Sequence, residues 1–362
     1  MSTIKRYHKE ELIGFVVDYL TRLSVPADDA RIVGEVLIAA DLRGVDSHGL
    51  HRLGSYYGTG IGKKLINPET PFSYVTETPT TALVDGANGI GQVVSYKVMK
   101  RCIEKAKQSG IAAITVNNSN HYGIAGYYSM MAIEHDLIGI SMTNSQPFVA
   151  PTYGKAPILG TNPISIAVPA KKKFPFVLDM ATSAVAYGKI QIHNKKNIPL
   201  PDGWGIDSDG HPTTDASKIK AGGVGALLPL GGLDITSGYK GYDLAAMVDI
   251  LCAVLSGGNF LTRVKGPASQ QPSGVSHFFL AIDIGAFRPV EDFKDQMDDM
   301  IQILQDAPKA AGQDRIYIAG EKEFELEAYN REYGVPLIRQ IVDDLQIEAD
   351  KAGVPFPESI PE

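Results

Sequence analysis

The sequence predicts an α/β fold: a mixed, largely antiparallel sheet flanked by helices, with an N-terminal helical hairpin and a helical C-terminal region. Three observations carry this prediction. Apolar residues recur at helical spacing over 9–23 and 28–43. Two strand–loop–helix units follow between residues 81 and 143, which indicates an α/β core. Strand-like segments at 164–168 and 176–179 flank a lysine-rich turn, which favours antiparallel pairing.

The remaining elements follow from apolar periodicity and from turn residues. After the hairpin we expect, in chain order, a strand at 82–85, a helix at 92–108, a strand at 111–116, a helix at 127–135, strands at 138–143, 164–168 and 176–179, a helix at 242–255, a strand at 278–284, and helices at 290–304, 323–332 and 336–352. Pro336 suits the first turn of that last helix, where no N–H is needed.

Three parts are expected along the chain. Residues 1–75 form a helical segment that packs with the C-terminal region, residues 76–290 form the α/β core, and residues 291–362 form the helical C-terminal region. The stretch 198–232 is rich in Gly, Pro and Asp, so it is predicted to be irregular, and long irregular loops in compact proteins usually serve function.

Composition excludes several classes of protein. A net charge of −7 argues against nonspecific nucleic-acid binding, which needs a dense basic surface. Two cysteines, Cys102 and Cys252, do not make a disulfide framework or a cysteine-rich zinc site. There is no long apolar run or signal-peptide core. We therefore expect a cytoplasmic protein with no nucleic-acid or membrane partner.

The common motifs of nucleotide and hydrolytic enzymes are missing. No G-x-G-x-x-G follows a predicted strand, and there is no P-loop, no G-x-S-x-G and no H-E-x-x-H. His48-x-x-His51 would hold a metal only if a third ligand such as His121 approached, and scattered histidines are weak evidence for that. We therefore predict no metal site.

The first cluster with chemical potential is the segment 46–52, Asp-Ser-His-Gly-Leu-His-Arg. If the preceding helix continues, His48 and Arg52 stand four residues apart on one face. Arginine clamps a carboxylate with two hydrogen bonds, and histidine transfers a hydroxyl proton near neutral pH, as a 2-hydroxy or 2-oxo acid requires. The alternative is a helix end whose Ser47 and His48 only cap the backbone, and the local sequence does not separate the two.

The second cluster is the segment 117–123, which contains His121 between a strand and a helix. Polar side chains at the carboxyl end of a strand are where α/β proteins bind ligands, and free N–H groups at a helix start bind anions. An N-capped turn is the alternative interpretation.

Further polar segments follow other strands or precede a helix, at 143–145, 160–163, 179–183 and 237–242. Asp179 would orient a histidine or bind a ribose hydroxyl, and Lys240, between glycines before a helix, suits a cofactor phosphate. Each segment alone also fits an ordinary polar turn. Together they predict a polar pocket rimmed by strand ends.

These segments together resemble the malate/L-lactate dehydrogenase family that is distinct from the Rossmann-type lactate and malate dehydrogenases. That family also contains ureidoglycolate, sulfolactate and diketogulonate dehydrogenases or reductases and cyclic-imine carboxylate reductases. The malate branch is the most similar, chiefly through 229–232 before Ser-Gly-Tyr-Lys-Gly at 237–241. The segments that carry the resemblance are 40–49, 119–123, 159–163, 179–183, 238–242 and 283–287.

The resemblance implies a non-Rossmann sheet that binds the cofactor, and homodimers whose active sites are partly closed by the partner subunit. It places proton transfer at His48 and His121 with Ser47 as a helper, and the substrate carboxylate at Arg52. From the polar strand-end segments we also expect Asp179 to take part in catalysis and Thr161 and Asn162 to bind substrate. The resemblance implies NAD or NADP, with NAD slightly favoured, bound by Ser145, Asp179, Met180, Ala181, Lys240, Gly241, Gly320 and Glu321. Asp243 and Ala319 depart from the family pattern, which leaves cofactor details open.

The function so predicted is hydride transfer between a nicotinamide cofactor and a small L-2-hydroxy or 2-oxo acid, with malate and oxaloacetate first. The alternatives are another 2-hydroxy acid (lactate, ureidoglycolate or sulfolactate) and a cyclic imino carboxylate, which would use the same carboxylate clamp. A non-catalytic binding protein is a further alternative, against which the intact His48, His121, Arg52 and Lys240 argue. A metal hydrolase is the third, and metal analysis of the purified protein would test it.

Overall fold

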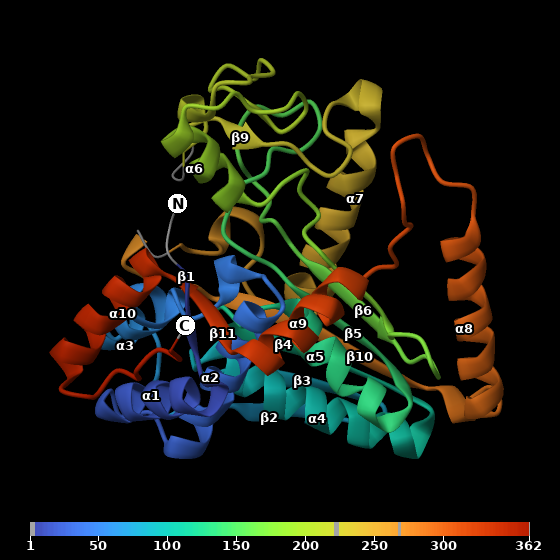
Figure 1. Cartoon of the computed structure of the whole chain (residues 1–362), viewed down its shortest axis with the longest axis horizontal. Coiled ribbons are helices and arrows are strands. Elements are labelled where there is room, and N and C mark those ends of the chain that lie inside the picture. Colours follow the sequence, from blue (N-terminus) through green and yellow to red (C-terminus); the bar gives the residue numbers. More distant parts are fainter. Residues whose placement is uncertain (1–3, 221–223, 267–268, 362) are drawn as a thin grey trace.

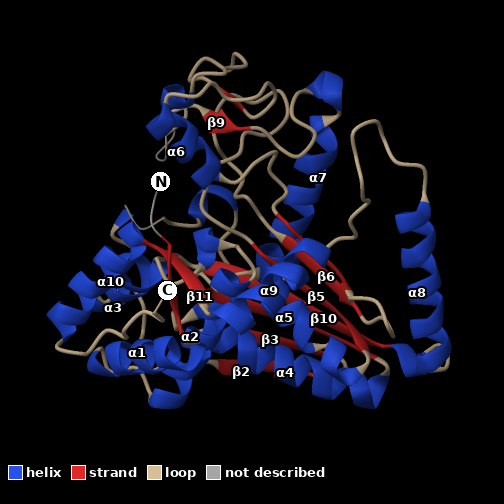
Figure 2. Cartoon of the chain, in the orientation of Figure 1, coloured by secondary structure: helices blue, strands red, loops and turns tan. Residues whose placement is uncertain are grey.

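The computed structural model describes residues 4–220, 224–266 and 269–361. Its centre is a seven-stranded sheet crossed by helices on both faces (Figures 1 and 2). In spatial order its strands are β2 (Ser73–Glu77), β3 (Thr81–Asp85), β4 (Ile111–Ser119), β10 (Val275–Asp283), β5 (Leu137–Thr143), β6 (Ile164–Val168) and β7 (Phe176–Met180). Only the β3–β4 pair is parallel, so the predicted mixed, largely antiparallel sheet is confirmed.

The strands bury apolar side chains on both faces. Helices α4 (Gly91–Ser109) and α5 (Ala125–Met131) cover one face, where Phe279 of β10 lies in their core cluster. Helix α7 (Gly238–Asp249), which continues as a π-helix to Val254, covers the other, where the adjacent Phe278 packs. Successive strand residues point to opposite faces, so a continuous apolar strand such as β10 is fixed between two helical layers.

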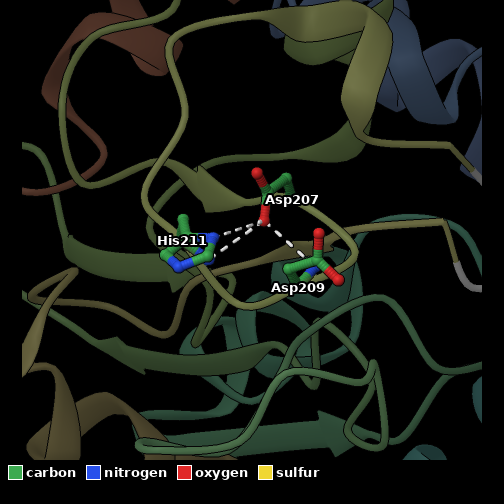
Figure 3. A group of neighbouring side chains, drawn as sticks. All are labelled: Asp207, Asp209 and His211. Carbon is green, nitrogen blue, oxygen red and sulfur yellow. Dashed lines mark hydrogen bonds and ion pairs between the residues drawn. The ribbon is translucent and has the colours of Figure 1, made fainter.

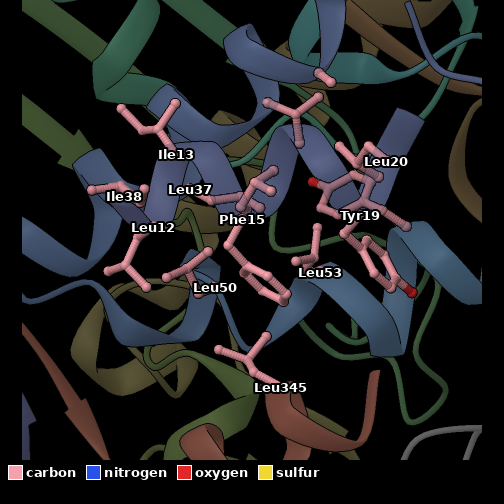
Figure 4. Packing of buried hydrophobic residues seen from close by; sticks show 14 of the residues in the cluster. Leu12, Ile13, Phe15, Tyr19, Leu20, Leu37, Ile38, Leu50, Leu53 and Leu345 are labelled. Atoms are coloured by element: carbon pink, nitrogen blue, oxygen red, sulfur yellow. The ribbon is translucent and has the colours of Figure 1, made fainter. Parts of the chain in front are cut away.

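The two ends of the chain meet in one separate core. Helices α1 (Lys9–Arg22), α2 (Ala27–Leu42) and α10 (Arg339–Ala352) contribute to a single apolar cluster (Figure 4). Leu37 and Leu345 lie in it with exposed fractions of 0% and 2%. Burying one such leucine stabilises the fold by roughly 1.5–3 kcal/mol, so the cluster holds the N-terminal segment firmly against α10.

One predicted element is wrong. The last helix was expected to begin at Pro336, but residues 335–338 form strand β11 (Val335–Ile338), which pairs antiparallel with β1 (Ile4–Tyr7). Arg6 lies opposite Pro336, and α10 begins only at Arg339. The partner strand lies more than 320 residues away in sequence, so no local pattern could reveal the pairing.

The remaining elements surround these two cores. They are α3 (Thr59–Gly62), α6 (Tyr187–Lys196), α8 (Val290–Asp306), α9 (Glu321–Tyr333), β8 (Gly205–Ile206) and β9 (Ala226–Leu227). The stretch 198–232 is mostly irregular, as predicted, although 221–223 lie outside the described residues. Helix α8 stands at one side of the molecule in Figure 1. No helix of the described residues is both apolar enough and long enough to cross a bilayer.

A buried histidine aligns the strand ends that matter for function. His277, in β10, has its Nε2 2.9 Å from Ser119 Oγ and its Nδ1 2.8 Å from Thr143 Oγ1. These hydroxyls belong to the last residues of β4 and β5, which flank β10. The segments that follow both strands therefore emerge at the same edge of the sheet. The division of the chain at residues 75 and 290 stays a prediction.

Candidate active site

Two histidines from distant segments stack at this edge. The ring centroids of His48 and His121 lie 5.3 Å apart, with 22° between the ring planes. Ser47 Oγ is 2.8 Å from His48 Nδ1, and Arg52 Nε donates to the main-chain oxygen of Ser47 at 2.9 Å. The predicted combination of His48, Ser47 and Arg52 with His121 is thus present in one place.

The segment 46–52 is held by the end of α2 and not by its continuation. Gly44 has φ +72°, a left-handed conformation that ends the helix, so the expectation of one helix through Arg52 is wrong. The buried Asp41 then accepts a hydrogen bond from the N–H of Leu50 at 2.8 Å. A Cβ on Gly49 would lie 1.8 Å from Asp41 Oδ1, so only glycine allows this approach.

His121 is held from behind by residues that sequence reasoning missed. The fully buried Asn120 donates to the main-chain oxygens of Asn88 (3.1 Å) and Gly89 (2.9 Å), which fixes the turn after β4. The hydroxyl of Tyr57 lies 2.7 Å from His121 Nδ1. Tyr57 belongs to a π-helix, Leu53–Gly58, a rare element found frequently at functional sites. No pattern in the local sequence predicted this π-helix or the contact of Tyr57 with His121.

Burial favours the neutral form of both histidines. Burial lowers the pKa of His48 to about 4, and the nearby charge of Arg52 adds to this. Burial also places the pKa of His121 well below its usual value of 6.5, with His48 and Arg52 contributing. No carboxylate of the described residues forms an ion pair with Arg52. The guanidinium therefore offers two free Nη atoms to an anion beside two neutral imidazoles.

The polar segments that contain Ser145, Thr161 and Thr182 form a second wall of the candidate site. Thr161 N–H donates to Ser145 Oγ at 3.0 Å, and Thr182 Oγ1 donates to the main-chain oxygen of Thr161 at 3.1 Å. Leu230 N–H donates to the oxygen of Thr182 at 2.9 Å, and a Cβ on Gly241 would lie 2.3 Å from the oxygen of Leu230. Three predicted segments, at 145, 161 and 179–183, therefore adjoin the start of α7.

Comparison with known proteins decides the family. Residues 7–346 match the family model of malate/L-lactate dehydrogenase. The chain belongs to this family. It is 48% identical over 350 residues to a malate dehydrogenase of Pyrococcus abyssi (96% of this chain, 95% of that protein) and 39% identical over 340 residues to an L-sulfolactate dehydrogenase of Methanocaldococcus jannaschii (94% and 95%). The structure of the malate dehydrogenase of Pyrococcus horikoshii superimposes with a TM-score of 0.90 at 45% identity, covering 98% of each chain.

Membership of this family makes the chain an oxidoreductase, a 2-hydroxy acid dehydrogenase that uses a nicotinamide cofactor. The residues at the second wall fit such a cofactor. Lys240 is exposed at the N-terminus of α7, and no acidic residue in the described parts of the chain pairs with it. A free ammonium at the start of a helix is suited to a pyrophosphate.

Other residues predicted for this dehydrogenase's cofactor lie along β7. Met180 pairs with Ile164, and Ala181 follows the strand. A Cβ on Gly320, which has φ +87°, would lie 2.9 Å from Cβ of Val177, so glycine lets the 319–321 turn pack against β7. Gly241 is likewise required for packing on Leu230. The cofactor contacts of these residues stay predictions.

Asp179 has a structural role besides the catalytic role predicted for it. Its Oδ2 accepts the N–H of Gly126 at 2.7 Å at the start of α5, and none of its described contacts is to a histidine. The exposed residue is still crowded by protein atoms, which raises the pKa of its carboxyl. Asp179 therefore anchors a helix start, and its catalytic role and its contact with the cofactor both stay predictions.

The hydrogen bonds bear on two further predicted residues. The buried Asn162 donates its amide to Ala245 O (2.9 Å) and Asp249 Oδ2 (3.1 Å), so its side chain is committed within the protein and not to substrate. The buried Glu321 carboxylate accepts from Arg315, from Gln305 and from the N–H of Ile318. Its Oε2 accepts only the bond from Ile318, so a contact of Glu321 with the cofactor stays a prediction. Thr161 keeps a half-buried hydroxyl, and its substrate role stays a prediction.

Among the described residues, His48 and His121 do not belong to a group of side chains spaced to hold a metal ion. The group with such spacing is Asp207, Asp209 and His211, in the loop between β8 and β9 (Figure 3). Asp207 Oδ1 there accepts the backbone N–H groups of Asp209 (3.1 Å) and His211 (3.0 Å). Those bonds account for the cluster as a tight turn stabilised by an aspartate side chain.

Proposed function

We propose that this dehydrogenase interconverts L-malate and oxaloacetate with NAD or NADP. The observation that carries the proposal is the unpaired Arg52 beside the neutral pair His48 and His121. An arginine without a protein counterion is suited to a substrate carboxylate. The choice of malate rests on the relatives called malate dehydrogenase, at 48% and 47% identity.

The roles of the residues follow from their free atoms. Because Arg52 Nε is bound to Ser47, its two Nη atoms remain to hold the C1 carboxylate with two parallel hydrogen bonds. A neutral histidine then accepts the C2 hydroxyl proton on oxidation and returns it to the carbonyl oxygen on reduction. The nicotinamide supplies the acceptor and donor of the hydride. His48 and His121 are both candidates for the proton transfer, with Ser47 holding the His48 ring.

Lys240, Ser145 and the segment 179–181 would hold the dinucleotide, and we favour NAD over NADP. We also propose a homodimer. Helix α8 supports this, because Met300, Ile303 and Leu304 leave 43%, 72% and 45% of their surfaces exposed, and a second copy would cover such a face. Light scattering of the purified protein measures the mass directly, and a monomer would contradict the dimer. The cytoplasmic location stays a prediction.

The function is tested by the absorbance of NADH and NADPH with oxaloacetate, pyruvate, a sulfonated 2-oxo acid and a cyclic imino carboxylate. We expect the highest kcat/KM with oxaloacetate. A higher value with another acid would overturn malate while keeping the reaction class. Turnover of none of the 2-oxo acids would overturn the proposal as a whole.

A further inference from the structure

The partner of the Nδ1 nitrogen of His121 is a hydroxyl group and not a carboxylate. Tyr57 Oη lies 2.7 Å from His121 Nδ1, and the same hydroxyl donates to the main-chain oxygen of His121 at 3.4 Å. Tyr57 is fully buried, and burial raises the pKa of its phenol well above 10, so the group stays neutral. Tyr57 therefore bridges the ring and the backbone of a single histidine.

We propose that Tyr57 is a positioning residue that holds His121 with its proton on Nδ1, so that Nε2 exchanges the proton with substrate. This inference rests on the proposed function. If Nδ1–H donates to Tyr57 Oη, the tyrosine O–H is free to donate to the oxygen of His121, so both contacts of the bridge form together. The opposite tautomer would leave that oxygen without the tyrosine proton.

The surroundings of Tyr57 supply the rest of the arrangement. The amide of the fully buried Gln92 makes no hydrogen bond of normal geometry within the described residues, yet it is close enough to lower the pKa of Tyr57. Gly123 N–H also points to His121 Nδ1, but at 3.4 Å it is the weaker contact of the two.

A neutral partner has a specific consequence for the chemistry. A carboxylate at Nδ1 would stabilise the imidazolium and raise its pKa, whereas a phenol keeps the ring neutral and still fixes its tautomer. A base with an unprotonated Nε2 is then ready for the hydroxyl proton of a 2-hydroxy acid. The proton moves from the substrate oxygen to Nε2, and Nδ1–H stays bonded to Tyr57 throughout.

The test combines ¹⁵N NMR of histidine-labelled protein with steady-state kinetics of the full chain. In the unchanged protein we expect the His121 proton on Nδ1. Tyr57→Phe should move it toward Nε2, where Gly123 N–H can serve Nδ1, and should lower kcat about 10-fold, which corresponds to about 1.4 kcal/mol. KM for the acid should stay nearly constant, because Arg52 carries that contact.

Tyr128→Phe is the matched control, because it removes another fully buried hydroxyl, one that binds the main-chain oxygen of Tyr122 and no histidine. It should leave the His121 tautomer and kcat as they were even where it lowers the melting temperature. A proton on Nε2 in the unchanged protein, or a Tyr57→Phe variant with unchanged kcat, overturns the inference. The NMR result stands whether or not malate is the substrate, so the two proposals fail separately.

Discussion

The two walls of the site differ in how fully their polar groups are paired. The first wall is formed by residues 46–57 together with His121. On this wall Arg52 has free Nη atoms, and the Nδ1 atoms of the two histidines lie against neutral hydroxyl groups. On the wall of strand ends, Asn162 and Asn144 bind both carboxylate oxygens of the buried Asp249. The first wall has free groups beside the histidines, whereas the interior of the second wall is satisfied and its spare groups, such as the exposed Lys240, lie at the surface.

This difference separates chemistry from framework. A buried polar network in which every group is satisfied makes a rigid frame, since breaking any bond leaves a costly unpaired group. Groups with unused capacity beside such a frame are free to bind a ligand without losing a protein contact. The sequence shows polar residues on both walls, but only their hydrogen-bond partners in the structure reveal which residues are satisfied and which are free to bind a ligand.

The sharpest way to test the comparison is to remove the histidines singly. His48→Ala and His121→Ala should each lower kcat, and the residue that transfers the proton should lose about 100- to 10,000-fold. His211→Ala is the matched control, because His211 lies in the exposed β8–β9 loop and contacts only Asp207 there. Normal turnover in both site variants would remove the histidines from the mechanism.

The next largest effect should come from Arg52→Gln. Losing a charged hydrogen bond to the carboxylate should raise KM for the acid about 10- to 100-fold, while the fold is kept. An unchanged KM would exclude Arg52 from substrate binding.

The same variant has a pH signature. Oxidation requires neutral histidine, so with His48 as the base kcat/KM should fall as the pH drops through about 4, its folded pKa. Arg52 lowers that pKa, so its removal should move this acid limb to higher pH. A pH profile of kcat/KM for both proteins checks the direction, and a shift to lower pH would contradict the assigned electrostatics.

The smallest effect on catalysis is expected on the satisfied wall. Asn162→Ala leaves the buried Asp249 without one of its donors, which should lower the free energy of unfolding by about 1–3 kcal/mol. KM for the acid should change little, because the Asn162 side chain is committed within the protein. Denaturant unfolding and kinetics measure the two quantities, and a large rise in KM with unchanged stability would restore Asn162 to the substrate site.

Much of the fold was predictable because the local spacing of apolar residues indicates helices and strands. Strand β6 (Ile164–Val168) and the start of α8 at Val290 lie where the pattern placed them. The family was predictable from ordered motifs, and His48, His121 and Arg52 were identified before any contact was known. Residue type and order along the chain were sufficient for these conclusions, because each depends on neighbours in the sequence.

Tertiary structure decided what depends on distant partners. The pairing of β1 with β11, the placement of Tyr57 behind His121 and the clamp of His277 between two strand ends all join segments far apart in sequence. The same holds for the hydrogen bond of Asp179 to the start of α5. The sequence by itself determined which chemical groups are available. Only packing decided which groups are satisfied internally and which stay free, because hydrogen bonds are settled by three-dimensional neighbours.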